Sequence, residues 1–174
     1  MTTDRRVYLL RHAKSSWDNA HLSDYQRPLA ARGRRDAARV ATHLARGDAV
    51  PQLVLCSSAA RTRETLEYLQ DAIGSAEVRL LDELYGADEE DVFDLLRGLE
   101  TRVSSVMVVG HNPTIEELAA SLAEDDSPAL QRMRSKFPTA GLAILDFDID
   151  SWRALALGTG HLVDFVIPKD LPDT

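Results

Sequence analysis

Short apolar runs alternate with amphipathic stripes along most of this sequence. Because strands that alternate with helices are typical of parallel βαβ units, the alternation predicts an α/β fold. The expected architecture is a three-layer α/β/α sandwich with a mostly parallel sheet and a late antiparallel strand. The predicted strands lie near residues 7–10, 53–56, 78–81, 105–109, 140–147 and 152–157.

Four helices are expected between these strands. The clearest start signal is Asn112 as N-cap followed by Pro113 at the first helical position. Residues 124–138 are expected to form a mobile loop near the active edge, and residues 168–174 a frayed tail. The helical stripes cover residues 30–45, 62–73, 92–99 and 112–122.

Length and composition favour one globular domain over residues 1–174. The chain has 174 residues and 44% hydrophobic content, enough for a sizeable core. No apolar run is long enough to span a membrane, and the first residues lack a signal-peptide arrangement, so a soluble, cytoplasmic protein is expected. The single cysteine, Cys56, falls within a predicted buried strand and is interpreted as a core residue.

The charge is unevenly distributed along the chain. The net charge of −8 argues against a nucleic-acid or anionic-membrane partner. Residues 1–50, however, carry ten Lys or Arg against five Asp or Glu. This basic segment can attract an anionic substrate, although the charges that follow Arg32 also suit an ordinary solvated helix face.

Polar residues capable of chemistry follow three of the predicted strands. Arg11 and His12 come directly after the first strand, Arg61 follows the second after a short turn, and His111 follows the strand near 105–109. A single Arg-His pair at a strand end is often structural. Because parallel strands place their carboxyl ends at one edge of a sheet, however, all four residues are expected to meet in one site.

These four side chains suit phosphoryl transfer to a histidine. Two arginines can hold a dianion, a helix N-terminus beside His111 adds N–H donors, and a neutral imidazole is a competent nucleophile. Metal-dependent hydrolysis fits less well, because the sequence lacks a spaced cluster of ligands. The alternating aspartates at residues 146–150 lack the Gly and Glu of a calcium loop and are interpreted as a hairpin end. We therefore expect no metal and no cofactor.

Four ordered motifs give the chain a specific family resemblance. They are residues 9–17 around Arg11-His12, Arg27-Pro28-Leu29 with Arg32-Gly33, residues 57–65 around Arg61, and Val109-Gly110-His111-Asn112-Pro113. Together they resemble the histidine phosphatase superfamily, which has a phosphoglycerate mutase-like fold, and within it the SixA-like phosphohistidine phosphatases. The resemblance implies that His12 becomes phosphorylated, that Arg11, Arg61 and His111 form the phosphate pocket, and that no metal takes part.

The chain also departs from the pattern of the family. Many members read Arg-His-Gly-Glu with an Asn four residues later, whereas this chain has Ala13, Lys14 and Asp18 at those places. Lys14 and Ser15 are expected to contact the substrate, and Arg27 is expected either to contact it or to order the first loop. Glu83 falls where the superfamily usually supplies a proton donor, and its alternative is a solvated carboxylate at a strand end.

The function predicted from these features is a metal-independent phosphatase that acts on phosphohistidine in a protein. The nearest alternative is a phosphomonoesterase for small metabolites on the same scaffold. A non-enzymatic binder of phosphate or phosphoproteins is less favoured, because binding alone does not need a nucleophile. The partner is accordingly a phosphorylated protein or a small phosphorylated substrate. His21, His43 and His161 are expected to lie outside the chemistry.

Overall fold

A computed structural model describes residues 4–47, 49–124 and 127–173. Its strands are β1 (Asp4–Arg11), β2 (Leu53–Ser57), β3 (Glu77–Leu81), β4 (Ser105–Gly110), β5 (Leu142–Asp148) and β6 (His161–Val166). Its helices are α1 (Ala31–Ala45), α2 (Ala60–Tyr68), α3 (Gln70–Ile73), α4 (Glu89–Arg97), α5 (Thr114–Leu122) and α6 (Pro128–Ser135). Short 3-10 helices are η1 (Asp24–Gln26), η2 (Asp82–Leu84), η3 (Trp152–Ala154) and η4 (Pro168–Asp170).

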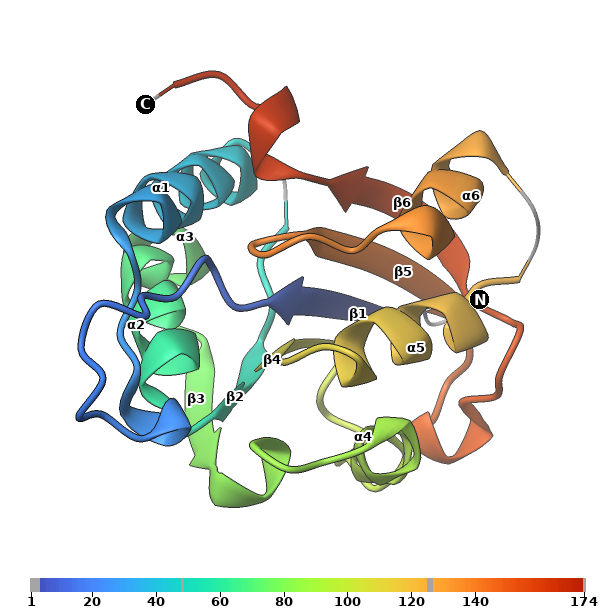
Figure 1. The fold of residues 1–174 in the computed structure, drawn as a ribbon. Helices are drawn as coiled ribbons and strands as arrows, with labels where there is room; N and C mark the ends of the chain where they lie inside the picture. The colour runs from blue at the N-terminus through green and yellow to red at the C-terminus, as the bar shows by residue number, and fades with distance from the viewer. Residues whose placement is uncertain (1–3, 48, 125–126, 174) are drawn as a thin grey trace.

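The strands form one six-stranded sheet in the order β3-β2-β4-β1-β5-β6. Neighbours among β3, β2, β4 and β1 run parallel, whereas β5 runs antiparallel to both β1 and β6. Helices α1, α2 and α3 cover one face of the sheet, and α4, α5 and α6 cover the other (Figure 1). The three-layer α/β/α sandwich with a late antiparallel strand is therefore confirmed.

Strand β1 shows why the parallel strands read as continuous apolar runs. Val7 and Leu9 point into the core under α4, α5 and α6, whereas Tyr8 and Leu10 point into the core under α1, α2 and α3. All four are at most 1% exposed. A strand that is covered on both faces has no polar side to alternate with. The same holds for β2, where Cys56 is buried as expected.

The chain after β4 departs from the sequence prediction in a strand and in a loop. The strand expected at 152–157 is wrong: Trp152 belongs to η3, and the last strand is β6, farther along the chain. The loop expected at 124–138 contains α6, which begins where Ser127 Oγ accepts a hydrogen bond from Leu130 N at 3.1 Å. Residues 125–126 lie outside the described residues.

The expected frayed tail is also folded over part of its length. Pro168 is buried within η4, Leu171 packs against the core under α1, and Asp170 forms an ion pair with Arg132. Helix boundaries differ as well. The second predicted helix is divided into α2 and α3 at Leu69, and α5 begins two residues after Asn112. None of the described helices is long and apolar enough to cross a membrane.

Candidate active site

The carboxyl ends of β1, β2 and β4 bring the predicted residues together. Arg11 pairs with Gly110 across β1 and β4, and His12 N donates to Gly110 O at 3.0 Å. The imidazole rings of His12 and His111 therefore lie close, with centroids 5.4 Å apart. Arg61 is buried in the first turn of α2, and its charge acts on both histidines.

His12 is held as a neutral imidazole with one nitrogen free to react. Its Nδ1 lies 2.7 Å from Ala13 O, and because a carbonyl only accepts, Nδ1 carries the proton of this bond. Nε2 then keeps its lone pair. Burial, together with the nearby charges of His111, Arg61 and Arg11, lowers the pKa of His12 to about 3. The ring is therefore uncharged and nucleophilic near neutral pH.

His111 is oriented by a residue at the end of β2. Its Nε2 lies 2.8 Å from Ser57 Oγ, and Ser57 is fully buried. Burial first, and then the charge of Arg61, lower the pKa of His111 to about 4. The ring of Tyr85 stands edge-on to it, with centroids 5.6 Å apart. Sequence reasoning missed Ser57 as a functional residue, although it stands at a strand end within one of the four motifs.

Arg61 is held by the loop between β1 and α1. Its Nη1 donates to Asp24 O at 2.7 Å, and its Nη2 donates to Asp24 Oδ2 at 3.0 Å. The hydroxyl of Tyr85 donates to the same Oδ2 at 2.5 Å. The hydrogen bond from Tyr85, followed by that from Arg61, lowers the pKa of Asp24 to about 2. Sequence reasoning missed both Asp24 and Tyr85.

Three polar atoms of this cluster lack hydrogen-bond partners. Arg11 Nη1 donates to Phe137 O at 3.0 Å, but Arg11 Nε is buried and unpartnered among the described residues. Arg61 Nε and His111 Nδ1 share this condition. Burial lowers the pKa of Arg11 from its ordinary value. Because buried polar groups are normally paired, the two guanidinium Nε donors, with His111 Nδ1 in the tautomer that protonates it, suit the oxygens of an anionic ligand.

The other predicted substrate contacts are placed differently. Arg27 Nη1 donates to Ser15 Oγ at 2.7 Å, and Arg27 also pairs with Asp24 and stacks on Trp17. Both Arg27 and Ser15 are buried. They order the loop, and through Asp24 that loop reaches Arg61. Lys14 contributes a backbone oxygen that accepts from Ala30 N at 2.8 Å.

Glu83 is not drawn into the cluster by any contact that the structure describes. It lies exposed in η2 and makes no hydrogen bond or ion pair with a described residue. Its neighbour Asp82 instead accepts a hydrogen bond from Ser58 Oγ at 2.6 Å. The role of Glu83 as proton donor stays a prediction.

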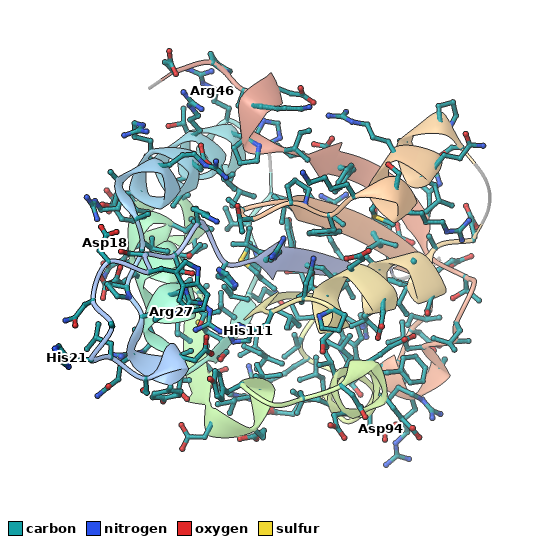
Figure 2. All side chains as sticks on the ribbon, in the orientation of Figure 1. Asp18, His21, Arg27, Arg46, Asp94 and His111 are labelled. Atoms are coloured by element: carbon teal, nitrogen blue, oxygen red, sulfur yellow. The ribbon has the colours of Figure 1, made fainter. Side chains whose placement is uncertain are left out.

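The remaining histidines make contacts away from His12. His43 and His161 pair with Asp164 and Glu124 respectively, each at 3.2 Å. Figure 2 shows His21 at the outer tip of the loop between β1 and α1, well away from His111. Within the described ranges, no three His, Cys, Asp or Glu side chains gather as metal ligands. That the chemistry needs no metal stays a prediction.

Comparison with known proteins places this chain in a family. Residues 7–92 match the histidine phosphatase superfamily (branch 1). The uncharacterized protein ML1117 of Mycobacterium leprae is 36% identical over 165 residues, which cover 92% of this chain and all of that protein. Phosphohistidine phosphatase SixA of Escherichia coli is 31% identical over 149 residues, covering 82% of this chain and 86% of that one.

A solved structure gives the same result. The protein histidine phosphatase SixA complexed with tungstate has a TM-score of 0.76 and 27% identity, covering 95% of this chain and 98% of that one. The chain therefore belongs to the histidine phosphatase superfamily, whose members are phosphatases with a phosphoglycerate mutase-like fold. Within that superfamily it is similar to phosphohistidine phosphatase SixA of Escherichia coli and to the solved SixA structure.

Proposed function

We propose that this chain hydrolyses phosphohistidine in a protein by transferring the phosphoryl group first to His12 and then to water. The observation that carries the proposal is the set of three buried, unpartnered atoms, Arg11 Nε, Arg61 Nε and His111 Nδ1, around a neutral His12. A phosphoryl group offers the oxygens that such donors need. The solved complex of a SixA with tungstate, another tetrahedral oxyanion, supports the same ligand class.

In the first step, Nε2 of His12 attacks phosphorus while the bond from phosphorus to the substrate nitrogen breaks. The substrate imidazole takes a proton from solvent on its other ring nitrogen and leaves as neutral imidazole with the electron pair of the broken P–N bond. Arg11 and Arg61 stabilise the charge on the equatorial oxygens. His111 holds its proton on Nδ1 if Ser57 Oγ donates to its Nε2, so that Nδ1 donates to a phosphoryl oxygen. A bound dianion raises the pKa of His111 and strengthens this donation.

In the second step, water attacks the phosphorus bound to His12. The P–N bond breaks, inorganic phosphate leaves, and His12 returns to the neutral imidazole that its burial favours. The proton lost by the water is carried away by the phosphate product. The absence of a metal from this cycle, action in the cytoplasm and function as one domain are parts of the same proposal.

The test is to trap the phosphorylated enzyme. Wild type and His12→Ala are mixed with a phosphohistidine-containing protein labelled on phosphorus and then quenched with alkali, which preserves phosphohistidine. We expect acid-labile label on the wild-type enzyme and none on His12→Ala, together with loss of turnover in the variant. His21→Ala, which removes an exposed imidazole of the loop, is the matched control. Substantial turnover by His12→Ala would contradict the covalent route.

The leaving group tests the substrate class. An alkyl phosphate releases an alkoxide that must be protonated, whereas a phosphohistidine releases an imidazole that departs readily near neutral pH. We therefore expect wild type to prefer phosphohistidine by kcat/KM, and Glu83→Gln to slow alkyl phosphate hydrolysis more than phosphohistidine hydrolysis. A far better rate with a small alkyl phosphate, lost in Glu83→Gln, would replace the proposal with the metabolite phosphatase.

A further inference from the structure

A basic groove with a volume of about 610 Å³ lies between α1 and α6. Its walls come from these two helices, from the segment after α6, and from the end of β6 with η4. The groove has an apolar floor that includes Phe165 and Ile167. Its charged lining residues are mostly cations, with only Asp36 acidic; the basic ones are Arg32, Arg35, Arg39, Arg132, Lys136 and Lys169. Such a cluster is unexpected on a chain with a net charge of −8.

One wall of the groove is joined directly to the active site. Pro138 and Thr139 line the groove. The residues on either side of them contact the catalytic pair: Phe137 O accepts from Arg11 Nη1 at 3.0 Å, and Ala140 N donates to His12 O at 3.0 Å. A molecule seated in the groove therefore lies beside the strand end that presents His12.

The opposite wall is fixed just as closely. Helix α1, which carries Arg32 and Arg35 into the groove, packs at Gly33 against the backbone of Lys14, two residues after His12. A Cβ at Gly33 would lie 2.1 Å from Lys14 O, so the helix can approach this closely only with a glycine there. Both walls are thus held in place relative to the nucleophile.

The groove already binds carboxylates of the chain itself. Arg132 forms an ion pair with Asp170, and Arg39 forms one with Asp173, both from the C-terminal segment that borders the groove. Arg35, Lys136 and Lys169, in contrast, form no ion pair with any residue of the described ranges. The groove therefore binds acidic groups of the C-terminal segment and keeps further cations available for other acidic groups.

We propose that this groove binds an acidic segment of the phosphorylated partner protein and so places the phosphohistidine of that protein at His12. This proposal rests on the proposed function. Charge complementarity selects the occupant: carboxylates pair with the lining cations, while interspersed apolar side chains cover Phe165 and Ile167. A nucleic acid fits less well, because the chain carries a net charge of −8 and would repel a long phosphate backbone beyond the groove.

Binding is tested without any turnover. The probe is a short fluorescein-labelled peptide of alternating Asp and Leu, measured by anisotropy at low salt with the full chain. We expect Arg35→Glu/Lys136→Glu to raise the Kd of the peptide by about tenfold or more, because two attractive charges become repulsive. Arg46→Glu/Arg153→Glu makes the same charge change at exposed residues outside the groove lining and should change Kd by less than about twofold. Equal effects of the two double variants would overturn the proposal.

Two further measurements complete the test. Asp170→Asn/Asp173→Asn releases Arg132 and Arg39 from the chain's own carboxylates and should therefore tighten peptide binding. Unchanged binding would contradict the inference that these two arginines bind the peptide. If a short oligothymidylate competes with the acidic peptide and binds more tightly, the groove binds a nucleic acid and the proposal is wrong.

The kinetic consequence separates this proposal from the proposed function. With a phosphohistidine protein whose site is flanked by acidic residues, Arg35→Glu/Lys136→Glu should lower kcat/KM about tenfold, whereas hydrolysis of p-nitrophenyl phosphate should stay unchanged. His12→Ala should lose both activities and keep peptide binding. If His12→Ala binds the peptide but wild type lacks turnover, the proposed function fails and the groove stands. Equal loss for both substrates in the groove variant would overturn the groove.

Discussion

Acidification provides a direct test of the burial of His12. The pKa of an imidazole is about 6.5 in an unfolded chain, whereas burial and the neighbouring cations lower the pKa of His12 to about 3. As the pH falls below about 6.5, the unfolded chain therefore binds a proton that the folded chain does not. The stabilisation that His12 contributes is complete above about pH 6.5 and is lost progressively as the pH falls toward 3.

The size of this loss follows from how far the pH lies below the pKa of the unfolded imidazole. A pH of about 5 lies about 1.5 units below the pKa of the unfolded imidazole, which is therefore protonated. The imidazole of the folded chain is still neutral at that pH. At about 1.36 kcal/mol per unit, His12 should cost about 2 kcal/mol of unfolding free energy between about pH 8 and pH 5. The side chain is only 8% exposed, so solvent screens little of this effect.

The assay is urea unfolding of wild type and His12→Asn at both pH values. The Asn amide can replace the donor that His12 Nδ1 gives to Ala13 O, and it does not titrate. We expect the stability of wild type relative to His12→Asn to fall by about 2 kcal/mol on acidification. His21→Asn, at an exposed site, should follow wild type. A difference between wild type and His12→Asn that is constant with pH would refute the reasoning.

Three other outcomes are expected from the site and the loop that borders it. Ser57→Ala removes the hydrogen bond to His111 and should lower kcat about tenfold with little change in KM, as steady-state kinetics on p-nitrophenyl phosphate would show. EDTA should leave this activity unchanged while vanadate inhibits it, and activity restored by one divalent ion after EDTA would contradict the mechanism. Gly33→Ala places a Cβ against Lys14 O and should lower stability by about 1–3 kcal/mol in thermal or urea unfolding, whereas Gly86→Ala, with no atom within 4 Å, should not.

The central strands and the four clustered residues were predictable because a strand that is buried on both faces appears in the sequence as an uninterrupted run of apolar residues. Strands β1, β2 and β4 each contain an uninterrupted run of apolar residues, and a parallel sheet places the residues at their carboxyl ends along one edge. The closeness of His12 and His111 is therefore a consequence of strand order, although the two residues are far apart in the sequence. No side-chain detail was needed for that step.

The segments after β4 were harder to predict from the sequence, because their apolar residues are placed by tertiary packing and do not repeat with the period of a helix or a strand. The mostly apolar stretch 152–157 has the composition of a short strand, yet Trp152 and Leu155 are buried from η3 and its cap, and Trp152 Nε1 donates to Val103 O at 2.7 Å. Strand β6 lies at the sheet edge with two of its six residues exposed and two more half-buried, so its apolar signal is weaker. In α6 only Leu130 and Met133 are buried, too few to give a clear helical stripe.

The surroundings of Arg61 depend on contacts that no local pattern encodes. Asp24 lies 37 positions from Arg61 and 61 from Tyr85, and it reaches both only because the loop after β1 folds back over the strand ends. Both terminal nitrogens of the Arg61 guanidinium donate to Asp24, Nη1 to its carbonyl and Nη2 to its carboxylate. The Nε donor of Arg61 is left without a partner among the described residues. Strand order thus brings Arg61 beside His12 and His111, whereas the loop determines which of its donors stay available for the phosphoryl group of the proposed function.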